Sequence, residues 1–288
     1  MIKNTLTTLT AAALLGGLSL GLQAAPSVEE VKADIEAFQG YYKKRFPDVP
    51  LEAYNDGVNA LPQYAHRRAN WEMIMEFPPY EPEMETAQEE WAAPFKNGKT
   101  FADCFADKPS ATQYPWYDEG DKTLHTIVGD INACLTGNGE EAIKNLNTGK
   151  IARLVAAYKE QFNGEPIAVD VSSEGAREWY QKGRKFYWTK RGQLNFACAD
   201  CHMRSAGKSI RGDVLSAGLG HTSGFPVYRT KWALKGKPWG TIHRRYKGCN
   251  EQVRAAAFKP QSDEYKAVEL YEAVMNTGIP MKVPSQRQ

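Results

Sequence analysis

The segment Cys198-Ala199-Asp200-Cys201-His202 constrains the fold of this chain more than any other feature. Two cysteines separated by two residues and followed directly by histidine are the attachment signature of a c-type haem, in which the thiols form thioethers and the imidazole binds the iron. The alternatives are a disulfide and half of a zinc site, but the sequence lacks the second cluster of ligands that zinc needs. One such motif predicts one covalently bound haem c.

Residues 1–25 have the pattern of a secretory signal peptide. Lys3 gives a positive start, an apolar stretch runs from Ala11 to Leu22, and Ala24-Ala25 provides a small-residue exit. An uncleaved anchor is the alternative, but the stretch is shorter than the roughly 20 residues that a spanning helix needs. We therefore expect a periplasmic protein without a membrane span, in a compartment where disulfides form.

The charge balance narrows the class of partner. The chain has 36 basic and 34 acidic side chains and a formal net charge of +2. A nucleic-acid-binding domain carries a clear basic excess, so no nucleic acid partner is expected. With 42% hydrophobic residues in 288, the chain can bury a core in more than one domain.

Two halves of the chain share an order of landmarks. Breaker residues between Asn163 and Ser173 predict a linker there. Each half shows, in order, a Glu-Trp pair, a cysteine, a later cysteine and a closing amphipathic helix: Glu90-Trp91, Cys104, Cys134 and then Glu178-Trp179, Cys198, Cys249. We interpret this order as a duplication. No alternating strand pattern is sustained, so the expected fold class is mainly α.

The two closing helices are predicted from apolar spacing. Positions i, i+3, i+4 and i+7 are apolar in both, with Ile151, Leu154, Val155 and Tyr158 in the first and Ala267, Leu270, Tyr271 and Val274 in the second.

The second axial ligand of the iron separates two functions. A methionine, Met275 or Met281, is typical of an electron carrier. Cys249 is the other candidate, and basic side chains at His243, Arg244, Arg245 and Lys247 lie close to it in sequence. Positive neighbours stabilise a thiolate and bind anions. The plainer alternative is a solvated basic loop that ends in a buried cysteine.

Three other histidines are not assigned a role. His66, His125 and His221 each stand without a second type of ligand nearby in sequence, and an isolated histidine is more often structural.

The chain resembles the SoxA family, the catalytic subunits of the SoxAX cytochromes of bacterial thiosulfate oxidation. The resemblance rests on the haem motif, on Arg245-Tyr246-Lys247-Gly248-Cys249-Asn250, and on the two-part organisation. It implies two tandem cytochrome c-like domains, residues 26–165 without haem and residues 166–288 with haem. It also implies that His202 and Cys249 ligate the iron, that Cys249 is a catalytic persulfide, and that Arg245 is the active-site arginine.

The implied activity is that of an L-cysteine S-thiosulfotransferase. It conjugates thiosulfate oxidatively to a cysteine of the carrier protein SoxYZ, while electrons pass to a SoxX-type subunit in a heterodimer. The dianionic substrate would be held by Arg245 with help from Lys247 or Arg244.

The chain departs from the two-haem members of this family. Where they have a first attachment motif, it has Cys104-Phe105-Ala106-Asp107-Lys108, without the second cysteine and the histidine. By the same resemblance Cys104 and Cys134 form a disulfide, which stabilises by about 3 to 4 kcal/mol on the loop-entropy model. Two free buried thiols are the alternative.

Two other functions stay open at this point. One is an electron-transfer cytochrome with Met275 or Met281 on the iron and an inert Cys249. The other is a cytochrome that binds sulfide or thiols and stores sulfur without transferring it.

Overall fold

The computed structural model describes residues 24–210 and 213–287. The predicted signal peptide, residues 1–25, lies outside the described residues except for its last two. No helix in the described part of the chain combines the length and the apolar character that crossing a membrane requires.

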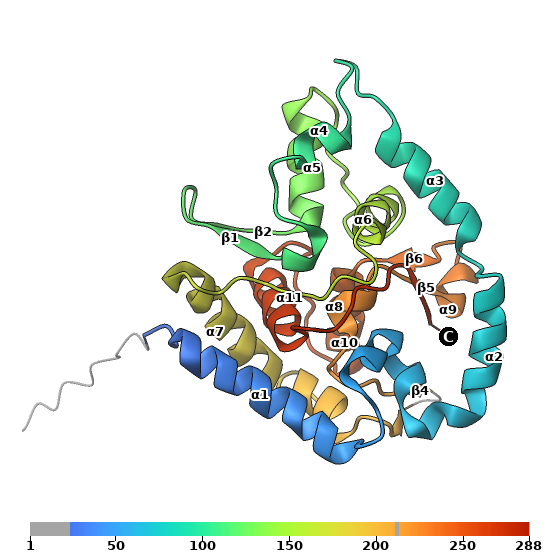
Figure 1. Ribbon diagram of the computed structural model, residues 1–288, viewed down its shortest axis with the longest axis vertical. Coiled ribbons are helices and arrows are strands. Elements are labelled where there is room, and N and C mark those ends of the chain that lie inside the picture. Colours follow the sequence, from blue (N-terminus) through green and yellow to red (C-terminus); the bar gives the residue numbers. More distant parts are fainter. Residues whose placement is uncertain (1–23, 211–212, 288) are drawn as a thin grey trace, which may run out of the picture.

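The fold is mainly helical, as expected, with a few short strands (Figure 1). The α-helices are α1 (Val28–Arg45), α2 (Ala65–Glu76), α3 (Glu81–Ala92), α4 (Phe101–Phe105), α5 (Ile127–Gly137), α6 (Lys150–Glu160), α7 (Glu174–Trp188), α8 (His221–Gly224), α9 (Thr230–Ala233), α10 (Ile242–Gln252) and α11 (Asp263–Met275). The tighter or wider helical turns are η1 (Leu51–Ala60), η2 (Pro62–Tyr64), η3 (Ala111–Gln113) and η4 (Asp200–Arg204).

The strands form three small sheets. Two are antiparallel pairs, β1 (Trp116–Asp118) with β2 (Thr123–His125) and β3 (Ser209–Ile210) with β4 (Asp213–Val214). In the third, β5 (Val227–Arg229) pairs antiparallel with β6 (Trp239–Gly240) and parallel with β7 (Ser285–Arg287).

Both predicted closing helices are present. They are α6 and α11, and the apolar residues that predicted them are buried in each. α6 packs against α3, and α11 packs against α7, so each half pairs its closing helix with the helix that carries the Glu-Trp pair. The segment between α6 and α7, where the sequence predicts a linker, contains no helix or strand of its own and bonds to residues 279–281.

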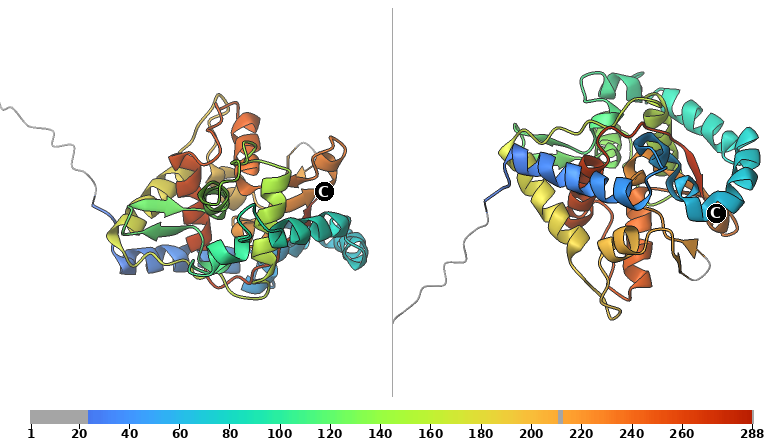
Figure 2. Two further views of the ribbon diagram at one scale, coloured as in Figure 1. Left: turned by 90° about the horizontal axis from the view of Figure 1, so that it is seen from above. Right: turned by 60° about the horizontal axis from the view of Figure 1, so that its bottom comes forward.

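Two hydrophobic clusters among the described residues do not follow the proposed boundary at residues 165 and 166. One cluster combines α1 and η1 residues such as Phe38 and Tyr54 with Tyr187 and Tyr271 of the C-terminal half. The other combines α3 to α6 with Trp239 and Met281. The N-terminal helix α1 therefore packs beside α7 and α11, as two views show (Figures 1 and 2). The division into two cytochrome c-like domains stays a prediction.

Helix α1 also holds the segment that contains the cysteine motif. The Tyr42 hydroxyl donates to the carbonyl of His202 at 2.7 Å and accepts from the amide of Gly218 at 2.8 Å. Arg45 donates to the carbonyls of Met203 and Ala206 at 2.7 and 2.8 Å. These bonds tie α1 to carbonyls at and just beyond the C-terminal end of η4.

Candidate haem site

A cavity of about 390 Å³ is lined by all four residues that were predicted to hold the haem and its iron. Cys198, Cys201 and His202 line it from η4 and the turn before it, and Cys249 lines it from α10. The three thiols are free, and none is part of a disulfide. Residues about 50 positions apart in sequence thus share one site.

The Asp200 side chain shapes the turn between the two motif cysteines. Its carboxylate accepts from the amide of Ala197 at 2.8 Å and from Arg204 at 2.7 Å. The first bond joins Asp200 to the residue just before Cys198, and Cys198, Cys201 and His202 all line the cavity.

His202 is buried and is oriented to bind a metal. Its Nδ1 lies 3.1 Å from the carbonyl oxygen of Ser216, so Nδ1–H donates there and the lone pair is on Nε2. Burial, then repulsion from His221 and Arg245, lowers the pKa of His202 well below its usual value. The imidazole is therefore neutral, which is the form that ligates iron.

Burial also raises the pKa of the motif thiols, Cys198 and Cys201. Thioether formation removes the ionisable group altogether, so the apolar surroundings that disfavour a thiolate do not oppose a thioether.

The mouth of the cavity exposes apolar side chains that a large flat ligand would cover. Leu194, Phe196 and Ile210 line the cavity and are 41%, 45% and 40% exposed. Large exposed apolar surface is unusual unless a ligand or partner covers it. Together with the free Nε2 of His202 and the three thiols, this rim shows that the residues present fit a covalently bound haem.

Basic side chains form part of the cavity wall. Arg245 lines it, as the sequence predicted, and so do Arg229, Lys231 and Arg287, which the sequence analysis missed. Arg229 and Arg287 are register partners on β5 and β7. Burial, then repulsion from Arg245, lowers the pKa of Arg229 to about 10. Asp213 pairs with Lys231 and lies 3.9 Å from Arg229.

Arg244 and Lys247 are not among the described residues that line the cavity. Arg244 lies over the Trp232 ring at 3.9 Å and donates to the carbonyl of Trp239, while Lys247 is exposed and 3.8 Å from Glu251. Successive residues of an α-helix lie about 100° apart around its axis. When Arg245 faces the cavity, Arg244 and Lys247 therefore point in other directions. The structure does not bring them to the predicted substrate site.

Neither candidate methionine reaches the site. Met275 and Met281 are 1% and 2% exposed, and Met281 packs in the cluster with α3 to α6. The part of the cavity wall that the structure describes contains neither side chain. Both are packing residues here.

Two of the three histidines that were expected to be isolated, His221 and His125, have polar neighbours in the structure. His221 lines the cavity, its ring is 4.6 Å from that of His202, and it bonds to Glu272. His125 lies beside Asp118 and Asp121. Glu272 is 51 residues from His221 in sequence, so spacing could not indicate that pair, whereas Asp118 and Asp121 are near His125 in sequence and the β-hairpin brings them together.

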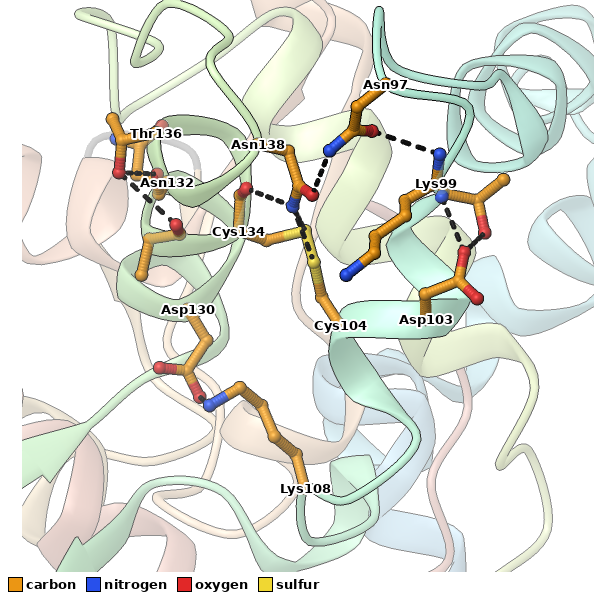
Figure 3. Close-up of a disulfide and its surroundings, with 12 residues drawn as sticks. Asn97, Lys99, Asp103, Cys104, Lys108, Asp130, Asn132, Cys134, Thr136 and Asn138 are labelled. Atoms are coloured by element: carbon orange, nitrogen blue, oxygen red, sulfur yellow. Dashed lines mark hydrogen bonds and ion pairs between the residues drawn. A yellow bond between two sulfur atoms is a disulfide. The ribbon is translucent and has the colours of Figure 1, made fainter.

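The disulfide between Cys104 and Cys134 is confirmed, with sulfur atoms 2.01 Å apart (Figure 3). It joins α4 to α5, and Asn138 Nδ2 lies 3.3 Å from Cys104 Sγ. The first half of the chain is thus crosslinked at the place where it lacks a haem motif.

Comparison with known proteins gives consistent matches. Residues 86–167 match the family model of the SoxA/TsdA cytochrome c domain. The chain is 42% identical over 259 residues to the L-cysteine S-thiosulfotransferase subunit SoxA of Chlorobaculum tepidum, which covers 90% of this chain and 88% of that one. It is 40% identical to the subunit of the same name from Allochromatium vinosum, over 94% of both chains.

A solved structure has the same fold. The crystal structure of SoxXA from P. pantotrophus matches with a TM-score of 0.67 and 28% identity, over 76% of this chain and 84% of that chain.

Proposed function

Because this chain belongs to the SoxA family of c-type cytochromes, we propose that it is an L-cysteine S-thiosulfotransferase that conjugates thiosulfate to a carrier cysteine through Cys249. The observation that carries this proposal is the single cavity lined by Cys249, Arg245 and the three residues of the haem motif. A sulfur nucleophile, an anion-binding cation and a redox centre are the groups that the reaction requires.

Cys198 and Cys201 would hold one haem c through thioethers, and His202 and Cys249 would bind its iron. Bound there, this group would supply one-electron transfer. Ser216 keeps Nε2 of His202 available for the iron. The apolar rim around Phe196 limits the access of water to the site.

Thiosulfate binds at the basic wall of the cavity. Arg245 lies one helical turn before Cys249 on α10, so a guanidinium that binds the sulfonate directs the outer sulfur toward the Cys249 sulfur. Arg229, Lys231 and Arg287 add positive charge to the same wall. These three side chains, and not Arg244 and Lys247, assist Arg245 in binding the dianion.

The sulfur chemistry has two steps. The terminal sulfur of a Cys249 persulfide forms a bond to the outer sulfur of thiosulfate, and the pair loses two electrons, which pass to a SoxX-type cytochrome. The thiolate of the SoxYZ cysteine, its proton lost to solvent, then attacks that outer sulfur. The bond to the persulfide breaks, and the sulfane-sulfonate group stays on the carrier.

The proposed function also requires a cell compartment and a partner subunit. We place it in the periplasm after removal of residues 1–25, in a heterodimer with the SoxX-type subunit. Residues 26–165 form the domain without haem, and residues 166–288 form the haem domain. The SoxXA structure that this chain resembles supports the partnership.

The mass of the Cys249 peptide tests the proposal. Purified holoprotein is digested without reductant, and we expect the peptide with Cys249 to carry one extra sulfur atom. The disulfide-linked peptides of Cys104 and Cys134 are the internal control and should carry none. A plain Cys249 thiol in a preparation with full turnover would remove the persulfide from the mechanism.

A further inference from the structure

A buried carboxylate, Glu272 on α11, receives two hydrogen bonds beside the cavity. The hydroxyl of Tyr246 donates to Oε2 at 2.6 Å, and Nδ1 of His221 lies 3.1 Å from Oε1. Glu272 is 3% exposed and lines the cavity. No step of the proposed reaction uses this group.

The chain of hydrogen bonds continues from Glu272 to the iron-ligand histidine. Nε2 of His221 lies 2.9 Å from the Ser216 hydroxyl, and Nδ1 of His202 lies 3.1 Å from the Ser216 carbonyl. One assignment satisfies every group: His221 donates from Nδ1 to Glu272 and accepts at Nε2 from the Ser216 hydroxyl. His202 then donates from Nδ1, which leaves Nε2 free.

These hydrogen bonds connect the two sides of the cavity. Tyr246 is on α10, three residues before Cys249, whereas Ser216 and His221 belong to the segment behind His202. Glu272 thus ties the element that carries Cys249 to the element that orients His202. A charge in a buried polar network acts at lower effective dielectric than one in water, so its field at the site is strong.

We propose that Glu272 is a positioning residue of the haem site, which acts through His221 and Ser216 to orient His202 and places a buried negative charge behind it. This charge favours the oxidised haem, because oxidation adds positive charge at the iron. The inference rests on the proposed function, since it takes His202 as the iron ligand.

The first half of the chain contains a matched network. Asp130 is 2% exposed, accepts from the Tyr114 hydroxyl at 2.6 Å, and lies 2.7 Å from Nδ1 of His125. Like Glu272, it is bonded to one tyrosine and one histidine, and Lys108 Nζ also lies 3.3 Å from it. It lies in the half that has no haem motif, so Asp130→Asn removes a comparable buried charge without changing the haem site.

The midpoint reduction potential of the haem in the isolated holoprotein tests the inference. Glu272→Gln should shift the potential to more positive values, Glu272→Asp should restore much of the wild-type value, and Asp130→Asn should leave it unchanged. The ferric electron paramagnetic resonance signal of Glu272→Gln should also shift, because the hydrogen-bonded network behind His202 loses its charged end.

A second variant covers the case in which Glu272→Gln does not load with haem. His221→Gln keeps the carboxylate but breaks the link to Ser216, and a smaller positive shift is expected. An unchanged potential in either loaded variant overturns the inference. Wild-type protein without covalent haem would overturn the proposed function instead, so the two failures are distinguishable.

Discussion

Arg245 and Lys247 are two residues apart on α10, and the structure gives them different surroundings. Arg245 lines the cavity together with Cys249, which follows it by four residues and lies on the same helical face. Lys247 points to solvent near Glu251. An exposed ion pair of this kind contributes little to stability, whereas a cation on the wall of a partly closed cavity binds anions strongly.

Replacing Arg245 should therefore impair thiosulfate use. We expect Arg245→Ala to bind haem normally and to lower kcat/KM for thiosulfate-dependent conjugation by about 10- to 100-fold, since a hydrogen bond to a charged group is worth roughly 1.5–3 kcal/mol. Lys247→Ala is the control and should retain wild-type kcat/KM. Equal losses in the two variants would contradict the assignment of Arg245 as the substrate-binding residue on this helix.

At the scale of the helices, the crossing of α7 and α11 depends on one glycine. Gly183 is buried in α7, and a Cβ built on it would lie 2.0 Å from the carbonyl oxygen of Ala267 on α11. That distance is far below van der Waals contact, and the obstacle is backbone, which no side-chain rotation relieves. The two helices can approach this closely only because the position has no side chain.

A substitution of Gly183, where α7 crosses α11, should destabilise the C-terminal half of the protein. We expect Gly183→Ala to lower the free energy of unfolding by about 1–3 kcal/mol, the usual cost of overpacking a core. Gly40→Ala is the control, because Gly40 lies on an exposed face of α1 with no atom within 4 Å of the added methyl group. It should raise the free energy of unfolding by up to about 1 kcal/mol through helix propensity. Denaturant unfolding measures both, and a stabilised Gly183→Ala would refute the close-crossing argument.

At the scale of the whole molecule, Lys159 connects the two halves. It lies on α6 and is buried, and its Nζ donates to the carbonyls of Thr222 and Phe225 at 2.6 and 2.8 Å. Burial lowers its pKa from 10.5 to about 8, with an opposing contribution from Glu269. The protonated lysine is thus held in an environment that disfavours its charge.

This lysine should make stability depend on pH. Because its pKa is lower in the folded protein, the unfolded chain binds more protons between pH 8 and pH 10.5, and stability rises with pH in that window. The contribution of Lys159 to the free energy of unfolding is fully present above the pKa that it has in the unfolded chain. It is lost as the pH falls through about 8, the pKa of Lys159 in the folded protein. We expect the free energy of unfolding of the wild type, relative to Lys159→Met, to increase by up to about 3 kcal/mol across the window.

Guanidinium unfolding of both proteins at the two ends of the window measures this difference. Comparison with Lys159→Met cancels the titration of the other groups. A difference that does not vary with pH would show that Lys159 keeps its ordinary pKa in the fold.

Contiguous sequence patterns determined the local chemistry of this protein. The motif Cys198 to His202 specifies its cofactor because all its reactive groups lie within five residues. The helices α6 and α11 were predictable because apolar spacing along one helix reports which face is buried. The pairing of Cys104 with Cys134 followed from family resemblance and is confirmed.

Only the tertiary structure decided which distant residues meet. It placed α1 against the end of the haem motif, set Arg229 beside Arg287 across a parallel strand pair, and brought His221 and Glu272 behind His202. It also turned Arg244 away from the cavity. Local patterns cannot specify such contacts, because they depend on how elements far apart in the chain pack. A residue type and its spacing therefore predicted which chemistry is possible, and packing determined which side chains share the site.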